Sequence, residues 1–167
     1  WLAELEDKPD THGARAIRRL TDDDFWYGDP QWAPSGEFVV VHANRTSDRE
    51  SVRFSINKNY DLWAIELAEG TPRALTSGPG PEVSPRWSPD GQRIVCLSSP
   101  RNGPHADVFN LMIVSPEDAQ PDARVVFDHH AEPNESPGAA PHPYPSFPLP
   151  EVAWEDDEHL VISAPVG

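Results

Sequence analysis

An internal repeat constrains the fold of this chain more than any other feature. Segment 29–41 aligns with segment 84–96, so that a Pro, a Trp, a second Pro and a Gly fall at identical offsets. Trp32 and Trp87 therefore lie 55 residues apart, and a weaker third copy surrounds Trp154. Recurrence of a fixed pattern indicates one supersecondary unit that is stacked repeatedly.

The second half of the unit repeats as well. Segment 62–67 leads to Leu-Thr at 75–76, and segment 1–5 leads to Leu-Thr at 20–21. A weaker version runs from 110–114 to 124–127. Two patterns that recur together are difficult to obtain by chance.

Each unit is predicted to contain four strands. The first strand ends at the Trp, and Ser88-Pro89-Asp90-Gly91 then has type I turn preferences. The second strand, 38–41 or 94–97, is continuously apolar, which predicts that both faces of its sheet are covered. The third strand runs over 61–67, and the short fourth strand ends at 75–76. The residues assigned to the repeat motif are Trp32, Pro34, Gly36, Trp63, Trp87, Pro89, Asp90, Gly91 and Trp154.

Four strands repeated at this period predict an all-β chain, namely a partial β-propeller of four-stranded antiparallel blades. We expect the end of one blade at 1–21, whole blades at 29–76 and 84–127, a Pro-rich loop at 128–150 and the start of a further blade at 151–167. The repeat tryptophans are expected to pack between adjacent blades, with an aromatic ligand cage as the minority alternative.

The motifs at 59–63 and 87–91, together with the Leu-Thr strand ends, resemble the WD-repeat-like propellers of the TolB type. The same repeat occurs in the N-terminal propellers of prolyl-oligopeptidase-family serine peptidases. The resemblance covers nearly the whole chain, and the peptidase propellers are the closer analogy. It implies a fold rather than a function, because the matching residues are turn and packing residues.

The strand count amounts to about three blades, beginning and ending on half a blade. Two copies are therefore expected to be able to complete a six-bladed ring; otherwise the chain is one arc of a longer polypeptide. The chain begins at Trp1 without a visible signal peptide, and we interpret this as loss of the true N-terminus.

Composition supports short strands and argues against some partners. Twenty prolines and ten glycines disfavour long helices. A net charge of −15 disfavours binding to nucleic acid. No apolar run approaches the ~20 residues of a membrane helix, so no membrane insertion is predicted. The partner class that remains is a protein or a peptide.

Catalytic machinery is not predicted within these residues. The Gly-x-Ser-x-Gly elbow of α/β-hydrolase peptidases is absent, as are Gly-rich phosphate loops and metal-binding motifs. Cys96 lies in an apolar strand and is interpreted as a buried hydrophobic residue rather than a nucleophile. No catalytic residue, metal or other cofactor is therefore predicted.

Several polar segments have side chains that suit a site. Segment 128–132, Asp-His-His-Ala-Glu, has metal-ligand chemistry, but neighbouring strand residues point to opposite faces, so a linker is favoured. Segments 22–24 and 155–158 are acidic but lack the spacing of a calcium loop, which favours turns. The loop at 128–150 holds seven prolines and is expected to be extended. In a peptidase propeller it would reach a catalytic domain or screen the central channel, and an insertion without a role at a blade edge is an equally good interpretation.

A basic patch stands out in segment 44–59, which carries Arg45, Arg49, Arg53 and Lys58. Guanidinium groups suit the carboxylate of a peptide. Pairing with the acidic surface of the chain itself is the favoured interpretation.

The leading functional hypothesis is a non-catalytic, substrate-gating propeller segment of a prolyl-oligopeptidase-like serine peptidase. The alternatives are a TolB-like interaction propeller without enzymatic activity and a scaffolding repeat protein. A TolB-like protein implies an extracytoplasmic location and a peptidase is compatible with the cytoplasm, so the compartment stays open.

Overall fold

The computed structural model describes residues 1–3, 17–54, 56–100, 110–116, 124–127 and 151–163, with only the backbone for 124–127. These residues form twelve strands and one short helix, α1 (Arg49–Arg53). The strands are β1 (Leu2–Ala3), β2 (Ile17–Arg18), β3 (Tyr27–Trp32), β4 (Phe38–Ala43), β5 (Asp61–Glu66), β6 (Pro72–Ala74), β7 (Glu82–Trp87), β8 (Ile94–Ser98), β9 (Asn110–Val114), β10 (Arg124–Phe127), β11 (Glu151–Trp154) and β12 (Leu160–Ser163).

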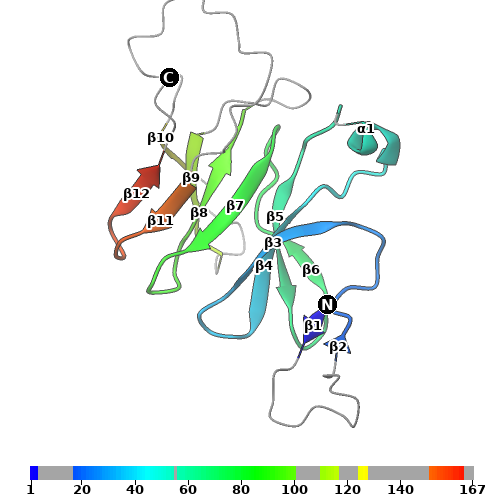
Figure 1. The fold of residues 1–167 in the computed structure, drawn as a ribbon, viewed down its shortest axis with the longest axis horizontal. Coiled ribbons are helices and arrows are strands. Elements are labelled where there is room, and N and C mark those ends of the chain that lie inside the picture. The colour runs from blue at the N-terminus through cyan, green and yellow to red at the C-terminus, as the bar shows by residue number, and fades with distance from the viewer. Residues whose placement is uncertain (4–16, 55, 101–109, 117–123, 128–150, 164–167) are drawn as a thin grey trace, which may run out of the picture.

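The strands make four antiparallel sheets that follow one another across the molecule in chain order (Figure 1). The first sheet has the strand order β3-β4-β5-β6, and the second sheet has β7-β8-β9-β10. The N-terminal pair, β1-β2, and the C-terminal pair, β11-β12, flank them. The prediction of an all-β chain with antiparallel four-stranded sheets is confirmed.

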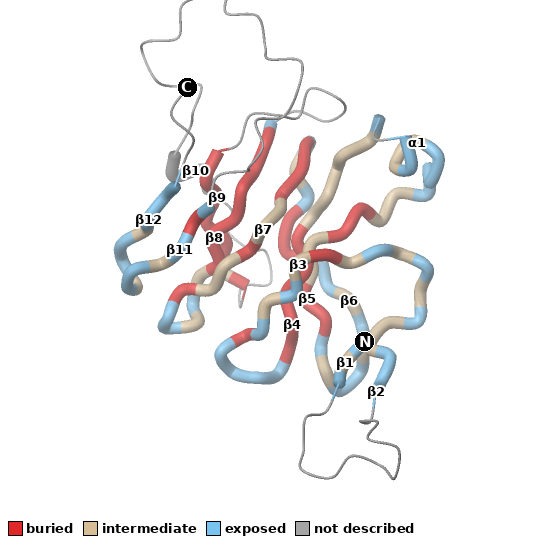
Figure 2. The backbone as a smooth tube through the Cα atoms, in the orientation of Figure 1, coloured by how far each residue is buried: buried red, intermediate tan, exposed pale blue. Residues whose placement is uncertain are grey.

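Buried residues are concentrated in the strands of the first and second sheets (Figure 2), and their apolar side chains pack in the seams between sheets. Val40 of the first sheet packs with Ile94 and Cys96 of the second. Alternate residues of the second sheet, such as Val95, pack with Val152 of the C-terminal pair. Strands β4 and β8 are continuously apolar over 38–41 and 94–97 because their alternating side chains enter different seams.

The repeat is visible in the backbone as well as in the sequence. The pairing of β3 with β4 is interrupted between Gly28 and Gln31, and the pairing of β7 with β8 at the equivalent place. Asp29 and Ser84, 55 residues apart, both have positive φ there, and each precedes a Pro. Two units therefore share one irregular backbone conformation, which supports their structural equivalence beyond a common strand order.

The third copy forms a hairpin although it lacks the turn Pro and Gly. The amide of Glu155 donates to the carbonyl of His159 at 2.9 Å. Asp156 Oδ1 accepts from the backbone amides of Glu158 and His159, both at 2.8 Å. The hydrogen bonds of an acidic side chain thus stabilise this turn, where the other units use Pro and Gly.

Helix α1 lies in the β4–β5 connection, within the segment 44–59 that carries the basic patch. Asp48 caps its N-terminus by accepting from the amide of Ser51 at 3.2 Å. Glu50 in the first turn and Arg53 in the last match the helix dipole. Within the described part of the chain, no helix has the length and apolarity needed to span a membrane.

Candidate functional site

A cluster of polar and aromatic side chains lies where segment 22–27 and the connection 44–60 meet the first sheet. Arg45 pairs with Asp23, Nη1 to Oδ2 at 2.7 Å. Its Cζ lies 4.6 Å from the ring centre of Phe25 and 4.8 Å from that of Trp63. The guanidinium is thus held by a carboxylate and by aromatic rings, and it ties segment 22–27 to the first sheet.

Tyr27 completes this cluster by donating its hydroxyl to Asp23 Oδ2 at 2.6 Å. Burial opposes ionisation of Asp23, but hydrogen bonds from Tyr27 and from the amide of Phe25, together with the charge of Arg45, lower its pKa overall. Burial and the bond to Asp23 raise the pKa of Tyr27. Both groups keep their ordinary charge at neutral pH, which suits a structural role.

The basic patch is therefore largely engaged by the chain itself. Besides the Arg45 pair, Arg49 donates to the carbonyl of Asp24 at 2.8 Å and its Cζ lies 4.3 Å from the ring centre of Phe25. The Cζ of Arg53 lies 5.7 Å from the ring of Phe54. These contacts agree with internal pairing for Arg45 and Arg49 and leave them poorly placed to capture a peptide carboxylate.

Two carboxyl groups meet in the seam between the first and second sheets. Asp61 begins β5, and Glu82 begins β7 with an exposed fraction of only 2%. Their side chains are hydrogen-bonded to each other, with Thr76 and Gly78 as further partners. Burial is the largest cause of a raised pKa for both groups. A buried carboxyl pair of this kind is a feature that the sequence analysis did not predict.

Trp26, His42 and Tyr60 form a neighbouring aromatic cluster. Ring centres lie 5.6 Å apart for Trp26 and His42 and 5.8 Å apart for His42 and Tyr60. Burial lowers the pKa of His42, and the charge of Asp29 opposes this effect. Tyr60 packs edge-on against both Trp26 and His42, and Trp26 itself stays exposed on the outer side of the cluster.

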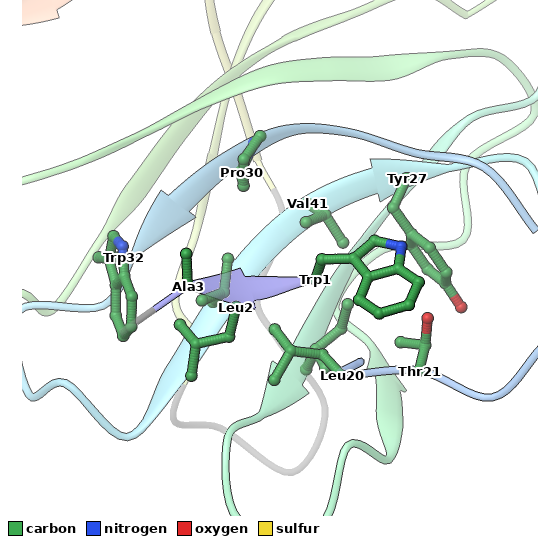
Figure 3. Close-up of a pocket in the computed structure, with 11 residues that line it drawn as sticks. Trp1, Leu2, Ala3, Leu20, Thr21, Tyr27, Pro30, Trp32 and Val41 are labelled. Carbon is green, nitrogen blue, oxygen red and sulfur yellow. The ribbon is translucent and has the colours of Figure 1, made fainter. Parts of the chain in front are cut away.

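A mainly apolar cavity of about 310 Å³ separates the N-terminal pair from the first sheet. Figure 3 shows Trp32 at one end and Trp1 with Tyr27 at the other, while Leu2 projects between them. Val39, Val41 and Ile65 supply its wall on the first sheet. The cavity is thus an incompletely filled seam, and it lacks the convergent polar groups of a ligand site.

The repeat tryptophans occupy related places but are not equally buried. Trp87 packs edge-on against Phe38, with ring centres 5.5 Å apart, in the seam between the first and second sheets. Trp154 packs in the following seam and donates its indole N–H to the carbonyl of Arg86 at 3.0 Å. Trp32, by contrast, is 54% exposed, because the N-terminal pair covers only part of its face.

Hydrogen bonds among their own residues close the turns of the motif. Ser88 donates its hydroxyl to Asp90 Oδ1 at 2.5 Å, and the amide of Gly91 donates to the carbonyl of Ser88 at 3.0 Å. Pro89 is exposed beside them. In the first unit the amide of Gly36 donates to the carbonyl of Ala33 at 2.8 Å, around Pro34.

The acidic segments with metal-ligand chemistry are engaged in other contacts where the structure describes them. Asp23 binds Arg45 and Tyr27, and the acidic segment 155–158 forms the β11–β12 turn. The cluster at 128–132 and the Pro-rich loop at 128–150 lie outside the described residues. Among the residues that the structure does describe, no group of three or more His, Cys, Asp or Glu side chains is arranged to hold a metal ion.

Cys96 is buried in the seam between the first and second sheets, with no exposed surface. Burial, assisted by the nearby charge of Glu82, raises the pKa of its thiol. Because the thiolate is the reactive form of cysteine, a buried thiol with a raised pKa agrees with the interpretation of Cys96 as a packing residue.

Comparison with known proteins gives a partial similarity. No family model matches the chain. It is 29% identical over 91 residues to dipeptidyl-peptidase 5 of Porphyromonas gingivalis, which is 53% of this chain and 13% of that protein. It is also 29% identical over 82 residues to dipeptidyl-peptidase 5 of Porphyromonas endodontalis, which is 48% of this chain and 11% of that protein. Each match thus spans a small part of the relative's length.

Proposed function

We propose that this chain is a non-catalytic β-propeller segment of a serine peptidase of the prolyl-oligopeptidase family. In that role its sheets are blades, and they restrict which peptides reach a catalytic domain that lies outside these 167 residues. The similarity to two dipeptidyl-peptidase 5 sequences, over about half of the chain, carries the proposal.

The fold supports the propeller part of the proposal. Propeller blades are four-stranded antiparallel sheets that bury their faces against their neighbours. The first and second sheets have this strand order, and consecutive sheets share apolar seams. Their inner strands β3 and β7 are joined by Arg86 and Asp29, Nη1 to Oδ2 at 2.9 Å.

The chemistry of the described residues fits a role without catalysis. The strongly perturbed groups, Tyr27, Asp61, Glu82 and Cys96, are engaged with neighbours or buried in seams. Tyr27 lines the cavity beside the N-terminal pair, but its hydroxyl is engaged by Asp23 and Arg45, and Asp61, Glu82 and Cys96 do not line that cavity. A supporting role for a neighbouring catalytic domain is the reading that these features favour.

The proposal is tested on the polypeptide encoded by the complete reading frame, compared with the 167-residue chain. We expect the longer polypeptide to cleave a chromogenic dipeptidyl substrate and to react with a fluorophosphonate probe for active serines, and the 167-residue chain to do neither. Substrates of increasing length should then show a sharp fall in kcat/KM, because access is restricted.

Other results would replace the proposal. A reading frame that contains no Gly-x-Ser-x-Gly segment, or a full-length protein without peptidase activity, would favour an interaction propeller. Equal kcat/KM for short and long substrates would leave a peptidase but remove the gating role. A stable dimer of the 167-residue chain in light scattering would instead favour ring completion by two copies.

A further inference from the structure

The carboxyl pair, Asp61 and Glu82, lies at a structurally important place. Asp61 belongs to the first sheet and Glu82 to the second, so their contact crosses the seam. The chain passes from one sheet to the other through the connection 75–81, directly beside the pair. The backbone amide of Glu82 also donates to the carbonyl of Tyr60 at 2.6 Å, which fixes the start of β7 against the start of β5.

Neutral donors surround the pair. The amide of Gly78 donates to both carboxyl groups, and the Thr76 side chain is hydrogen-bonded to Glu82. The Thr76 oxygen also accepts from the amide of Leu62 at 2.8 Å, so it is held in place. A Cβ at position 78 would lie 2.1 Å from Glu82 Oε1, so this close approach requires a glycine.

The remaining oxygens of the pair have no donor. Glu82 Oε2 and Asp61 Oδ1 are buried and have no hydrogen-bond partner among the described residues. An ionised carboxylate in such a place is strongly destabilised, and two ionised carboxylates in contact repel each other as well. One proton placed between them removes the repulsion and supplies the missing donor.

The surroundings provide no positive charge that would replace this proton. The titratable groups that face Glu82 are the Asp61 carboxyl from β5 and the Cys96 thiol from β8. The connection 75–81 contributes the uncharged Thr76 and Gly78. Within the described part of the chain, no Lys, Arg or His contributes to the pKa of either carboxyl.

We propose that Asp61 and Glu82 share one proton, and that this proton keeps the first and second sheets in contact at the 75–81 end of their seam. Loss of the proton leaves two charges in a buried contact, and the start of β7 then separates from β5. The pair is in this sense a pH-sensitive device within the seam, independent of any peptidase activity.

The sign of the effect follows from the direction of the pKa shift. Burial, followed by the charge of Asp61, raises the pKa of Glu82 from 4.5 to about 8. The native state therefore holds a proton that the unfolded chain has already released, so stability falls as the pH rises through this window and the loss is complete above about pH 8. Between pH 6 and pH 9 the unfolding equilibrium constant should increase on the order of a hundredfold.

Glu82→Gln tests this directly, because the amide is neutral at every pH and still donates to Asp61. Urea unfolding of the 167-residue chain is measured at pH 6 and pH 9. We expect the unfolding equilibrium constant of the wild type to increase on the order of a hundredfold from pH 6 to pH 9. The constant of Glu82→Gln should increase by about threefold or less. Glu66→Gln, which removes an exposed carboxylate at the far end of β5, is the control and should follow the wild type.

Two further measurements keep the proposal open to refutation if the variant folds poorly. The side-chain ¹³C signal of Glu82 in the native wild type should titrate well above pH 6, and a midpoint near 4.5 would overturn the shared proton. At pH 9 the amide of Glu82 should exchange faster in the wild type than in Glu82→Gln. Parallel pH profiles for the two proteins, or equal exchange rates, would also overturn it.

Discussion

Three successive units carry a valine at the same position. Replacing each of them by alanine in turn separates the contribution of seam packing to stability from the contribution of strand propensity. Val40, Val95 and Val161 are equivalent, because each pairs with the residue just before a repeat tryptophan. Val40 lies in the seam between the first and second sheets, and Val95 in the following seam, both without exposed surface. Val161 is 54% exposed.

The expected cost follows from what each alanine leaves behind. The substitution removes two carbon atoms, and their return to water accounts for about 1.6 kcal/mol at a buried site. The cavity that remains adds about 1 kcal/mol, since β strands on both sides limit its collapse. Val40→Ala and Val95→Ala should each lower the free energy of unfolding by about 2 to 3 kcal/mol. Val161→Ala should lower it by about 0.5 kcal/mol or less, chiefly through strand propensity.

Urea unfolding followed by tryptophan fluorescence provides the measurement, with a common m-value as the check on two-state behaviour. The prediction is a large and similar loss at the two buried positions and a small loss at the exposed one. Equal losses at all three positions would refute the reasoning, because they would mean that the valines act through their own strands. A small loss of stability in Val40→Ala alone would mean that the seam between the first and second sheets does not hold those sheets together.

Two further predictions concern turns and the arginine cluster. Gly36→Ala should cost about 1 kcal/mol, because its φ is +74°, and Gly91→Ala should cost more, because its Cβ would lie only 3.2 Å from Pro34 Cβ; thermal unfolding compares the two. Arg45→Lys should cost about 1 kcal/mol in urea unfolding even though the charge opposite Asp23 is kept, because an ammonium group cannot stack between two rings. Equal costs for the two glycines, or an unchanged stability in Arg45→Lys, would contradict these interpretations.

The repeating part of the architecture was predictable because it depends on local pattern. Apolar runs at 38–41 and 94–97 become strands β4 and β8, and the Pro–Gly turns precede them. Covered faces on both sides follow from the same runs, because no alternate position is polar. The strand boundaries extend by one or two residues beyond the pattern, since pairing continues past the apolar positions.

The carboxyl pair was not predictable, because its burial depends on contacts between sheets. Glu82 follows a Pro-Gly-Pro segment, where hydropathy places a charged residue on the surface. It is buried only because the neighbouring sheet approaches, with Asp61 more than twenty residues away in sequence. The one usable sign was that Glu82 starts a strand in the second unit, at the position where the first unit has the aromatic Tyr27. The exposure of Trp32 could not be predicted from the neighbouring sequence, because it depends on how much of the tryptophan the N-terminal pair covers.

The position of Cys96 has a practical consequence. Its thiol is enclosed between two sheets and resists ionisation, so an alkylating reagent must wait until those sheets come apart. The rate of alkylation therefore measures how often the two sheets separate, and no label has to be introduced. Because the chain has a single cysteine and it lies in the seam between two repeats, the modification reports on the opening of that seam alone.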